Sequence, residues 1–396
     1  MAVETEGRST GSWLAFWNDV RIRGAILQAV VLLLLIAFIL FIVHNTATNL
    51  ARLGVASGFG FLDRVAGFDI GITLIDYNLT SSNARAFLVG LLNTLLVSAC
   101  GVVLATLIGF TVGVLRLSSN WLVARLATVY VETLRNVPLL LQIVFWYFGV
   151  LSALPSVRQS LVIGDAVYLN NRGLSVPAPV PEAGFAVIPL ALVVAVVAAV
   201  ILYRWARARQ ARTGEQFPAI LTGIGLVVVL PLLAAALAGF PLSWNLPELK
   251  GFNFEGGTRI LPEFVALLLA LSLYTGAFIA EIVRSGIQSV SHGQTEAARA
   301  LGLRPGTTMR LIVIPQALRV IVPPLTSQYL NLTKNSSLAV VIGYPDLVSV
   351  FSGTVLNQTG QAVEVIAITM AVYMTISLII SLFMNWYNRR VRLVER

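Results

Sequence analysis

The polar side chains that could bind a small ligand occupy two short stretches of an otherwise apolar sequence. Arg135 and Lys334 supply positive charge, and a fixed cation in a low-dielectric cleft favours an anion such as a carboxylate. Polar side chains inside a bilayer also need partners or water. The candidates for a substrate pathway are Arg135, Asn136, Gln142, Lys334, Asn335, Ser336 and Ser337. The alternative, weighted equally, is that Arg135 binds a lipid phosphate and Lys334 has a helix-packing or helix-end role.

The sequence contains no catalytic or metal-binding constellation. One cysteine and two histidines are too few for a zinc site of the usual spacing, and no nucleophile or carboxylate pair stands at a suitable spacing. A phosphate-binding loop needs a lysine after a glycine, but Lys250 follows a leucine and Lys334 follows a threonine. We therefore expect no catalytic residue, no metal and no cofactor bound by this chain. If ATP drives the function of this protein, we expect a separate subunit to use it.

A third polar stretch, residues 285–310, is patterned as two short helices joined by a turn. Ser291 and Gln294 fit a capping box before the first helix. Gly302 suits a left-handed helix end, and Pro305 suits the first turn of the next helix. The alanines of the first helix would allow another surface to approach closely. A solvated amphipathic linker is the alternative interpretation.

Composition indicates that membrane helices position these residues. Of the 396 residues, 57% are hydrophobic and only 11% are charged, and the mean hydropathy is +0.84. A soluble protein carries roughly a quarter charged residues, so a set of soluble domains is excluded. The net charge of +9 could indicate nucleic acid, but the arginines lie between apolar runs. We therefore expect contact with membrane lipid and no nucleic-acid partner.

Seven stretches reach or approach the ~20 apolar residues that a helix needs to cross a membrane. They are 25–43, 86–115, 137–153, 185–203, 217–240, 264–280 and 365–385. An eighth, 336–351, is interrupted by Gly343, Pro345 and Asp346, which is tolerated where protein or a cavity covers the break. The prediction is an all-α integral membrane protein with about eight transmembrane helices. Gly343 and Pro345 are a candidate hinge.

The distribution of basic residues predicts the orientation. The segments assigned to the inner side contain 19 arginines and lysines and the outer ones seven, with Lys334 assigned to neither. The positive-inside rule therefore places both termini in the cytoplasm. The run at 25–43 is too long for a signal-peptide core and is expected to stay attached as an anchor. The arginine-rich connector at 204–212 is expected to fix the topology, and a role with anionic lipid stays open.

Charged residues also bear on the source of energy. A proton-coupled carrier would more often place carboxylates or histidines at mid-membrane, and the seven clear runs contain no Asp, Glu or His; Asp346 in the broken stretch is the exception. Glu132, Glu263, Glu281 and Glu364 fall at predicted helix ends, where solvated or paired structural roles are expected.

The spacing within the third polar stretch resembles a family signature. Glu296-Ala297-Ala298, then Gly302 and then Ile312-x-Ile314-Pro315 resemble the EAA motif of the inner-membrane permeases of binding-protein-dependent ABC importers, with Ile314 at a position that is usually Leu. In that family the loop forms a coupling helix that docks into a groove of the ATP-hydrolysing subunit. The resemblance assigns this role to Glu296, Ala297, Ala298, Gly302 and Pro315.

Other stretches, at 91–94, 134–142 and 334–347, are similar to the polar amino acid permeases of the histidine/glutamine type. The similarity covers roughly 86–153 and 261–390 and implies a five-helix core. The expected organisation is 1–85 as cytoplasmic N-terminus, anchor and outer loop, 86–153 and 261–396 as the two parts of the core with the coupling loop at 285–315, and 154–260 as an insertion with two extra helices. This layout is similar to that of the general L-amino-acid permeases, whose substrates include Glu, Gln, Asp and Asn.

The resemblance implies a permease subunit in a bacterial inner membrane that passes polar L-amino acids from a periplasmic binding protein into the cytoplasm. Its partners would be the ATP-binding cassette ATPase subunits, a second permease subunit, homologous or identical, and the binding protein. The alternative is a gradient-driven secondary carrier or channel, which would need no ATPase partner.

Overall fold

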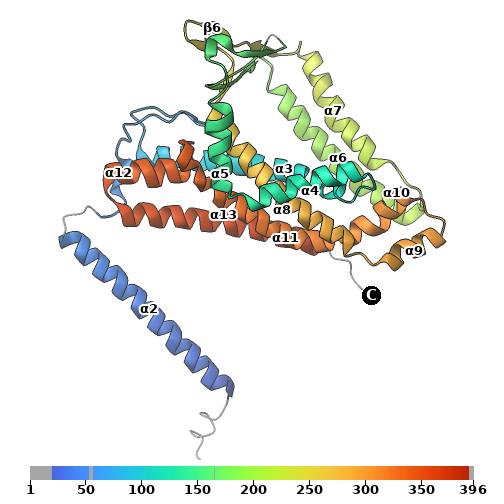
Figure 1. Cartoon of the computed structure of the whole chain (residues 1–396), viewed down its shortest axis with the longest axis horizontal. Helices are drawn as coiled ribbons and strands as arrows, with labels where there is room; N and C mark the ends of the chain where they lie inside the picture. The colour runs from blue at the N-terminus through green and yellow to red at the C-terminus, as the bar shows by residue number, and fades with distance from the viewer. Residues whose placement is uncertain (1–19, 53–56, 165, 392–396) are drawn as a thin grey trace, which may run out of the picture. The chain divides into compact units, whose positions relative to one another are not determined.

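The computed structural model describes residues 20–52, 57–164 and 166–391 (Figure 1). Arg8, Arg392 and Arg396, which the charge count assigns to the inner side, lie outside the described residues. The chain forms two compact units. The first contains the residues up to Leu92 and Leu347–Ile376, and the second contains Asn93–Asp346 and the residues from Ser377 onward.

Helices dominate the described residues, which confirms the predicted helical membrane fold. The longer helices are α2 (Val20–Arg52), α3 (Asn83–Leu115), α4 (Trp121–Asn136), α6 (Val187–Thr213), α7 (Ala219–Leu237), α8 (Pro262–Gln288), α11 (Ile314–Asn335) and α13 (Ala362–Val391). The short ones include α5 (Leu139–Val144) and the π-helical η2 (Phe145–Leu151). In the described part of the chain, seven helical segments are long and apolar enough to cross a membrane, and one bent pair raises the number to eight.

The predicted span at 137–153 is the second half of a broken helix. Helix α4 and the following segment, Leu139–Leu151, are bent by 106°. Pro138 causes the break because proline has no amide hydrogen and biases the residue before it toward an extended backbone; Val137 accordingly has φ −96° and ψ 126°. The sequence prediction missed α4 as part of the span because charged residues interrupt its apolar pattern.

The eighth predicted span, 336–351, differs in position from the structure. The apolar helical segment is Pro305–Ile342, built from α10 (Pro305–Thr308), the π-helical η4 (Met309–Val313), α11 and the 3-10 helix η5 (Ser336–Ile342). Gly343, with φ +76°, ends it, and η6 (Val348–Val355) and α12 (Leu356–Thr359) follow. Arg319, counted as part of an inner loop, lies within α11. The charges of Arg319, Arg310 and Lys334 interrupt the apolar pattern, so this span was not predicted from the sequence.

The core of the first unit is aromatic. Phe61, in the short helix η1 (Gly60–Asp63), is fully buried with its ring centroid 6.1 Å from that of Phe351. Phe87 on α3 meets Phe351 edge-on at 5.0 Å, and Val365 on α13 completes the cluster. The Asn83 side chain donates to the Phe61 carbonyl at 2.9 Å. These contacts fasten η1 and η6 to the helices of this unit.

Among the described residues, eight short strands form where the sequence predicted only loops. They are β1 (Leu161–Ile163), β2 (Val167–Asn170), β3 (Gly173–Val176), β4 (Ala178–Pro181), β5 (Leu242–Asn245), β6 (Glu248–Lys250), β7 (Asn253–Glu255) and β8 (Thr258–Ile260). The order β1-β2-β3-β8 makes a four-stranded antiparallel sheet, and β4-β5 and β6-β7 are separate pairs. Lys250 donates to Glu255 at 3.1 Å, and this hydrogen bond raises the pKa of the lysine.

The strands and the predicted coupling loop lie at opposite ends of α8. Strand β8 ends two residues before this helix, and α9 (His292–Ala300) begins four residues after it. With 27 residues, α8 is about 40 Å long at the rise of ~1.5 Å per residue, which exceeds the ~30 Å hydrocarbon layer. Helix α6 also starts just after a strand, β4, and α7 ends just before β5.

Glycines let α3 and α8 approach closely. A Cβ atom on Gly109 would lie 2.5 Å from the Ile279 side chain, and one on Gly113 would lie 2.7 Å from the Ala280 carbonyl oxygen. These two glycines are four residues apart, a spacing that brings membrane helices together because no side chain separates their backbones. At the far end of α8, Gly286 makes room for Ile321 of α11 in the same way.

Candidate functional site

The predicted coupling loop forms a short exposed helix. In α9, Ala298 is buried and faces the body of the protein. At 100° per residue the opposite face carries Gly293, Glu296 and Ala300, all exposed. Leu301, at the helix end, is 79% exposed. This surface has small side chains, one carboxylate and one large apolar side chain, and it is free for contact in the described chain.

The start of α9 differs from the prediction in one detail. Ser291 is the N-cap residue, as expected, but its side chain makes no capping hydrogen bond, so the predicted capping box with Gln294 is wrong. The first turn is closed by a backbone bond, in which the Gln294 amide donates to the Ser291 carbonyl at 3.0 Å. The exposed side chain of Glu296 instead lies 3.5 Å from Nδ1 of His292, one turn earlier on the same helix.

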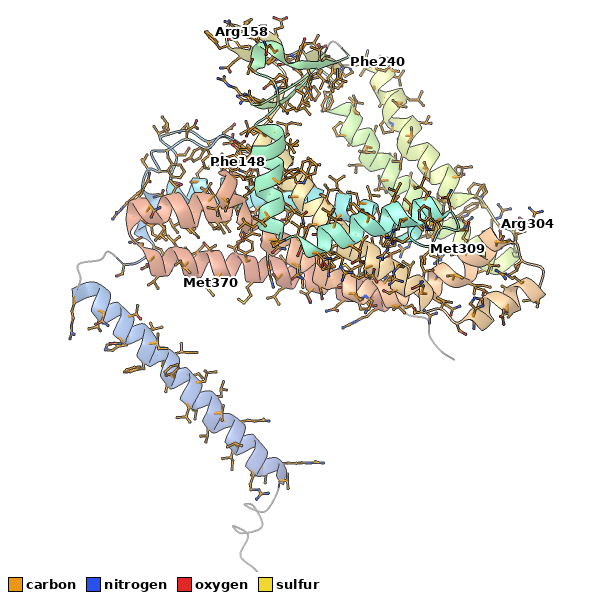
Figure 2. The ribbon with its side chains drawn as sticks, in the orientation of Figure 1. Phe148, Arg158, Phe240, Arg304, Met309 and Met370 are labelled. Atoms are coloured by element: carbon orange, nitrogen blue, oxygen red, sulfur yellow. The ribbon has the colours of Figure 1, made fainter. Side chains whose placement is uncertain are left out.

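The end of α9 has the predicted turn. Gly302 has φ +73° and Pro305 occupies the first turn of α10, while Arg304 projects from the connection (Figure 2). The second helix is not short, because it continues through η4 into α11. The π-helical turn lies directly before Pro315, which cannot donate a backbone hydrogen bond and would clash with the carbonyl four residues earlier in a regular helix. The wider register accommodates Pro315 without ending the helix.

Two candidate pathway residues lie at the break between α4 and α5. The Gln142 amide donates to the carbonyls of Leu134 and Val137, at 2.9 and 3.0 Å, and so satisfies acceptors that the break leaves without helical partners. Asn136 is exposed and its amide donates to the Glu132 carbonyl at 2.7 Å. Both side chains therefore stabilise the bend in this structure.

The other candidates lie at the end of α11. Lys334 is exposed and Asn335 is half-buried, whereas Ser336 is fully buried. The hydroxyls of Ser336 and Ser337 each donate to a carbonyl three residues earlier, at 2.7 Å. These bonds fit the tightening of the helix from α11 into the 3-10 helix η5. The predicted pathway residues thus fall into two groups, one at each helix break.

A charged cluster at Glu281 connects three helices. Arg116, just after α3, and Arg284 of α8 each donate to the Glu281 carboxylate. Arg135 of α4 lies 3.9 Å from the same carboxylate, with its guanidinium 5.1 Å from the Phe278 ring centroid. Glu132 is 3.6 Å from Arg116. Three cations against two carboxylates leave the cluster one positive charge in excess, with Arg135 still one-third exposed.

Sequence reasoning expected a solvated or paired structural role for Glu281, and the structure shows a paired one; it missed Arg116 and Arg284 as the partners. Arg284 follows Glu281 by three residues, a spacing that pairs side chains on a helix, and this signal was available. The other helix-end carboxylates also have partners, because Glu263 accepts from Tyr147 at 2.9 Å and Glu364 accepts from the Gly58 amide at 2.7 Å.

A reciprocal pair of hydrogen bonds holds the turn that contains the candidate hinge. The fully buried Tyr344 donates its hydroxyl to the Asn93 carbonyl, and the Asn93 amide donates to the Pro345 carbonyl, both at 2.9 Å. Gly343 itself is exposed, and a Cβ added there would meet no other atom within 4 Å. The turn is therefore anchored on one side by Tyr344 and unobstructed at Gly343.

The described residues contain no group of three or more His, Cys, Asp or Glu side chains that could hold a metal ion. The chemistry of the site is suited to binding an anion and to transmitting a movement between helices. It has cations at helix breaks and an exposed helix at one end of α8.

Comparison with known proteins identifies the family. Residues 226–393 match the family described as binding-protein-dependent transport system inner membrane component. The chain is 54% identical, over 96% of its length and 94% of the relative's, to the general L-amino acid transport system permease protein AapQ of Rhizobium johnstonii. It belongs to this family of inner-membrane transport components. It is 45% identical, over 96% of each chain, to the glutamate/glutamine/aspartate/asparagine transport system permease protein BztB of Rhodobacter capsulatus.

Membership of the binding-protein-dependent family confirms the resemblance to importer permeases and makes this chain a multi-pass inner-membrane protein. The matched segment includes α8, α9, α11 and α13. A solved structure described as an amino acid ABC transporter with histidines aligns with 78% of this chain and 94% of its own, at 22% identity and a TM-score of 0.46.

Proposed function

We propose that this chain is the permease subunit of an ATP-driven importer that moves polar L-amino acids, such as Glu, Gln, Asp and Asn, from a periplasmic binding protein into the cytoplasm. The observation that carries the proposal is the full-length similarity to AapQ, named as a general L-amino acid permease, and to BztB, whose name specifies these four amino acids. The excess positive charge at the Glu281 cluster supports an anionic or carboxylate-bearing substrate.

ATP would be hydrolysed on separate cassette ATPase subunits docked at α9. Its exposed face of Gly293, Glu296 and Ala300 offers little side-chain bulk, which suits insertion into a groove. Because α8 is longer than the membrane is thick, the strands at its other end would face the periplasm and the binding protein. Both termini would be cytoplasmic, as the distribution of basic residues predicts. A second permease subunit, identical or homologous, would complete the translocation path.

The force from α9 would reach the membrane region along α8. Glu281 ties α8 to the end of α3 through Arg116 and to α4 through Arg135, so a shift of α8 would be passed to the bend at Pro138. Arg135, Asn136 and Gln142 at that bend, and Lys334, Asn335, Ser336 and Ser337 at the other break, would line the path. Gly343 and Pro345 would act as the hinge, with Tyr344 as its fixed point.

Co-purification of the ATPase from native membranes in mild detergent tests this proposal. Glu296→Arg reverses a charge on the outward face of α9, and Gly302→Asp puts a side chain on a backbone with φ +73°, which is unfavourable for any residue with a Cβ. We expect each variant to lose most of the ATPase and of ATP-dependent uptake.

Gly306→Asp is the matched control, because Gly306 is also exposed, has open space around it and does not have a positive φ. It should retain the ATPase. If the wild-type chain purifies folded without an ATPase, and uptake of labelled Glu follows the membrane potential, the chain is a gradient-driven carrier and the proposal fails.

A further inference from the structure

The inserted helices α6 and α7 enclose an apolar groove that no side chain of the described residues fills. The two helices pack against each other as an antiparallel hairpin (Figure 1), and the groove along their contact has a volume of about 380 Å³. Its walls include Val196, Ala199, Val200 and Tyr203 of α6 and Gly223 and Val227 of α7. The α6 residues recur every three to four positions, so they form one face of that helix.

A cation lies at the end of this groove. The Arg207 guanidinium is 5.2 Å from the ring centroid of Tyr203, the last groove residue on α6. From Val196 to Arg207 is eleven residues, or about 16 Å along the helix. One leaflet of a ~30 Å hydrocarbon core is ~15 Å deep. The groove and the arginine therefore have the spacing of an acyl chain and the phosphate of its headgroup.

The arginines beside the groove are not neutralised. In the part of the chain that the structure describes, no carboxylate lies within ion-pair distance of Arg204, Arg207 or Arg212. Arg209 differs, because it pairs with Glu215 at 2.5 Å and lies over the Trp205 ring. The connector thus has three arginines available for a ligand and one that is already satisfied.

Aromatic side chains set the depth of this cluster. Trp205 and Phe217 meet edge-on with ring centroids 5.7 Å apart, at the level where α6 leaves its apolar stretch. Tryptophan and tyrosine concentrate at the boundary between hydrocarbon and headgroups. Together with Tyr203 they place the guanidinium groups of Arg204 and Arg207 at headgroup level.

We propose that this hairpin binds an anionic phospholipid, with an acyl chain in the groove and the phosphate on Arg204 and Arg207. A zwitterionic lipid would bring its own cation toward the arginines and would therefore bind with lower affinity. Charge complementarity also disfavours a second copy of this chain, whose identical arginines would repel these. The proposal does not depend on which substrate is transported.

Lipid binding to the purified full chain can be measured by native mass spectrometry with phosphatidylglycerol and phosphatidylcholine as probes. Phosphatidylglycerol should bind more tightly. The double variant Arg204→Gln, Arg207→Gln should weaken it roughly twentyfold, since a basic residue near an anionic surface contributes about fivefold in affinity. Arg209→Gln, which removes an arginine of the same connector that is already paired with Glu215, is the control and should change binding less than twofold.

A second pair of variants tests the groove. Val200 and Val197 are both about half exposed on α6, at 54% and 52%, but only Val200 lines the groove. Val200→Trp should fill it and weaken phosphatidylglycerol binding several-fold, whereas Val197→Trp should not. Equal binding of the two lipids, an equal loss in Arg209→Gln, or equal effects of the two tryptophans would overturn the proposal. So would crosslinking of Val200→Cys to another polypeptide, and not to lipid, in native membranes.

Discussion

Helices α8 and α6 have the same length, 27 residues, but different surroundings. Over the most apolar stretch of each, 56% of α8 is buried inside the chain and only 6% of α6. Both are apolar enough to cross a membrane. Hydropathy therefore identifies a span but does not say whether protein or lipid covers it.

Side-chain size accounts for the difference. Along α8 the buried positions are mostly small, among them Ala266, Ala270, Gly276, Ala277 and Ala280, so that other helices can approach its backbone. Along α6 only Ala195 and Ala206 are buried, and the exposed positions of its apolar stretch, 187–201, are mostly valine and leucine. In a membrane, close packing supplies the attraction between helices because apolar side chains gain nothing by leaving lipid.

The largest expected effect comes from filling the contact between α3 and α8. Gly109→Leu would place a side chain where even a Cβ lies 2.5 Å from Ile279, and overpacking of this kind costs about 3 kcal/mol. We expect a large drop in the thermal unfolding temperature in detergent. Gly225→Leu on α7 is the control, because open space surrounds Gly225, and it should change stability by less than about 0.5 kcal/mol. If both variants lost the same stability, the proposed difference between the tightly packed α3–α8 contact and the loosely packed α6–α7 hairpin would be contradicted.

A smaller effect should follow from Glu281→Gln, which leaves three arginines with Glu132 as their remaining carboxylate. Breaking a fully buried pair costs about 3–5 kcal/mol, and because the Glu281 side chain is 25% exposed we expect about 2 kcal/mol in the free energy of unfolding. Chemical denaturation of the purified chain measures it. Glu215→Gln on the hairpin breaks the exposed pair with Arg209 and should have no measurable effect. If the two variants behave alike, the charged cluster at Glu281 does not stabilise the packing of the helices that it connects.

The smallest of these effects is expected at the bend between α4 and α5. Gln142→Leu removes the donor for the carbonyls of Leu134 and Val137, which costs about 1 kcal/mol. Gln210→Leu on exposed α6 is the matched control and should be neutral. The KM for uptake separates two roles of Gln142, because loss of a bend stabiliser lowers the amount of folded protein without changing KM. A raised KM at normal protein levels would instead assign Gln142 to the substrate.

Sequence predicted the apolar spans well where no charge interrupts them. It failed at α4 and at Pro305–Ile342, where charged residues such as Arg135 and Arg319 interrupt the apolar pattern. Arg135, like Arg116, is tolerated inside the fold because it lies against Glu281 on another helix. Those partners are distant in sequence, with 165 residues between Arg116 and Glu281. No local pattern reports such a pairing.

The turn within the predicted coupling loop was the most predictable part of the candidate site. Gly302 and Pro305 fix backbone geometry locally, so residue type alone indicated the turn. The strands were not predicted, because β1–β8 are three or four residues long and their pairing joins positions up to about 80 residues apart, as in Val176 with Thr258.

The pairing of β3 with β8 means that residues 177–257, which include α6 and α7, could be removed without breaking the four-stranded sheet. Val176 and Thr258 are register partners in adjacent antiparallel strands, so the chain leaves and re-enters the sheet at neighbouring points. A two-residue hairpin turn of the Asn-Gly kind could join them and replace everything between. The gene could thus gain or lose the whole α6–α7 hairpin at one locus while β3 still leads directly to β8 and on to α8.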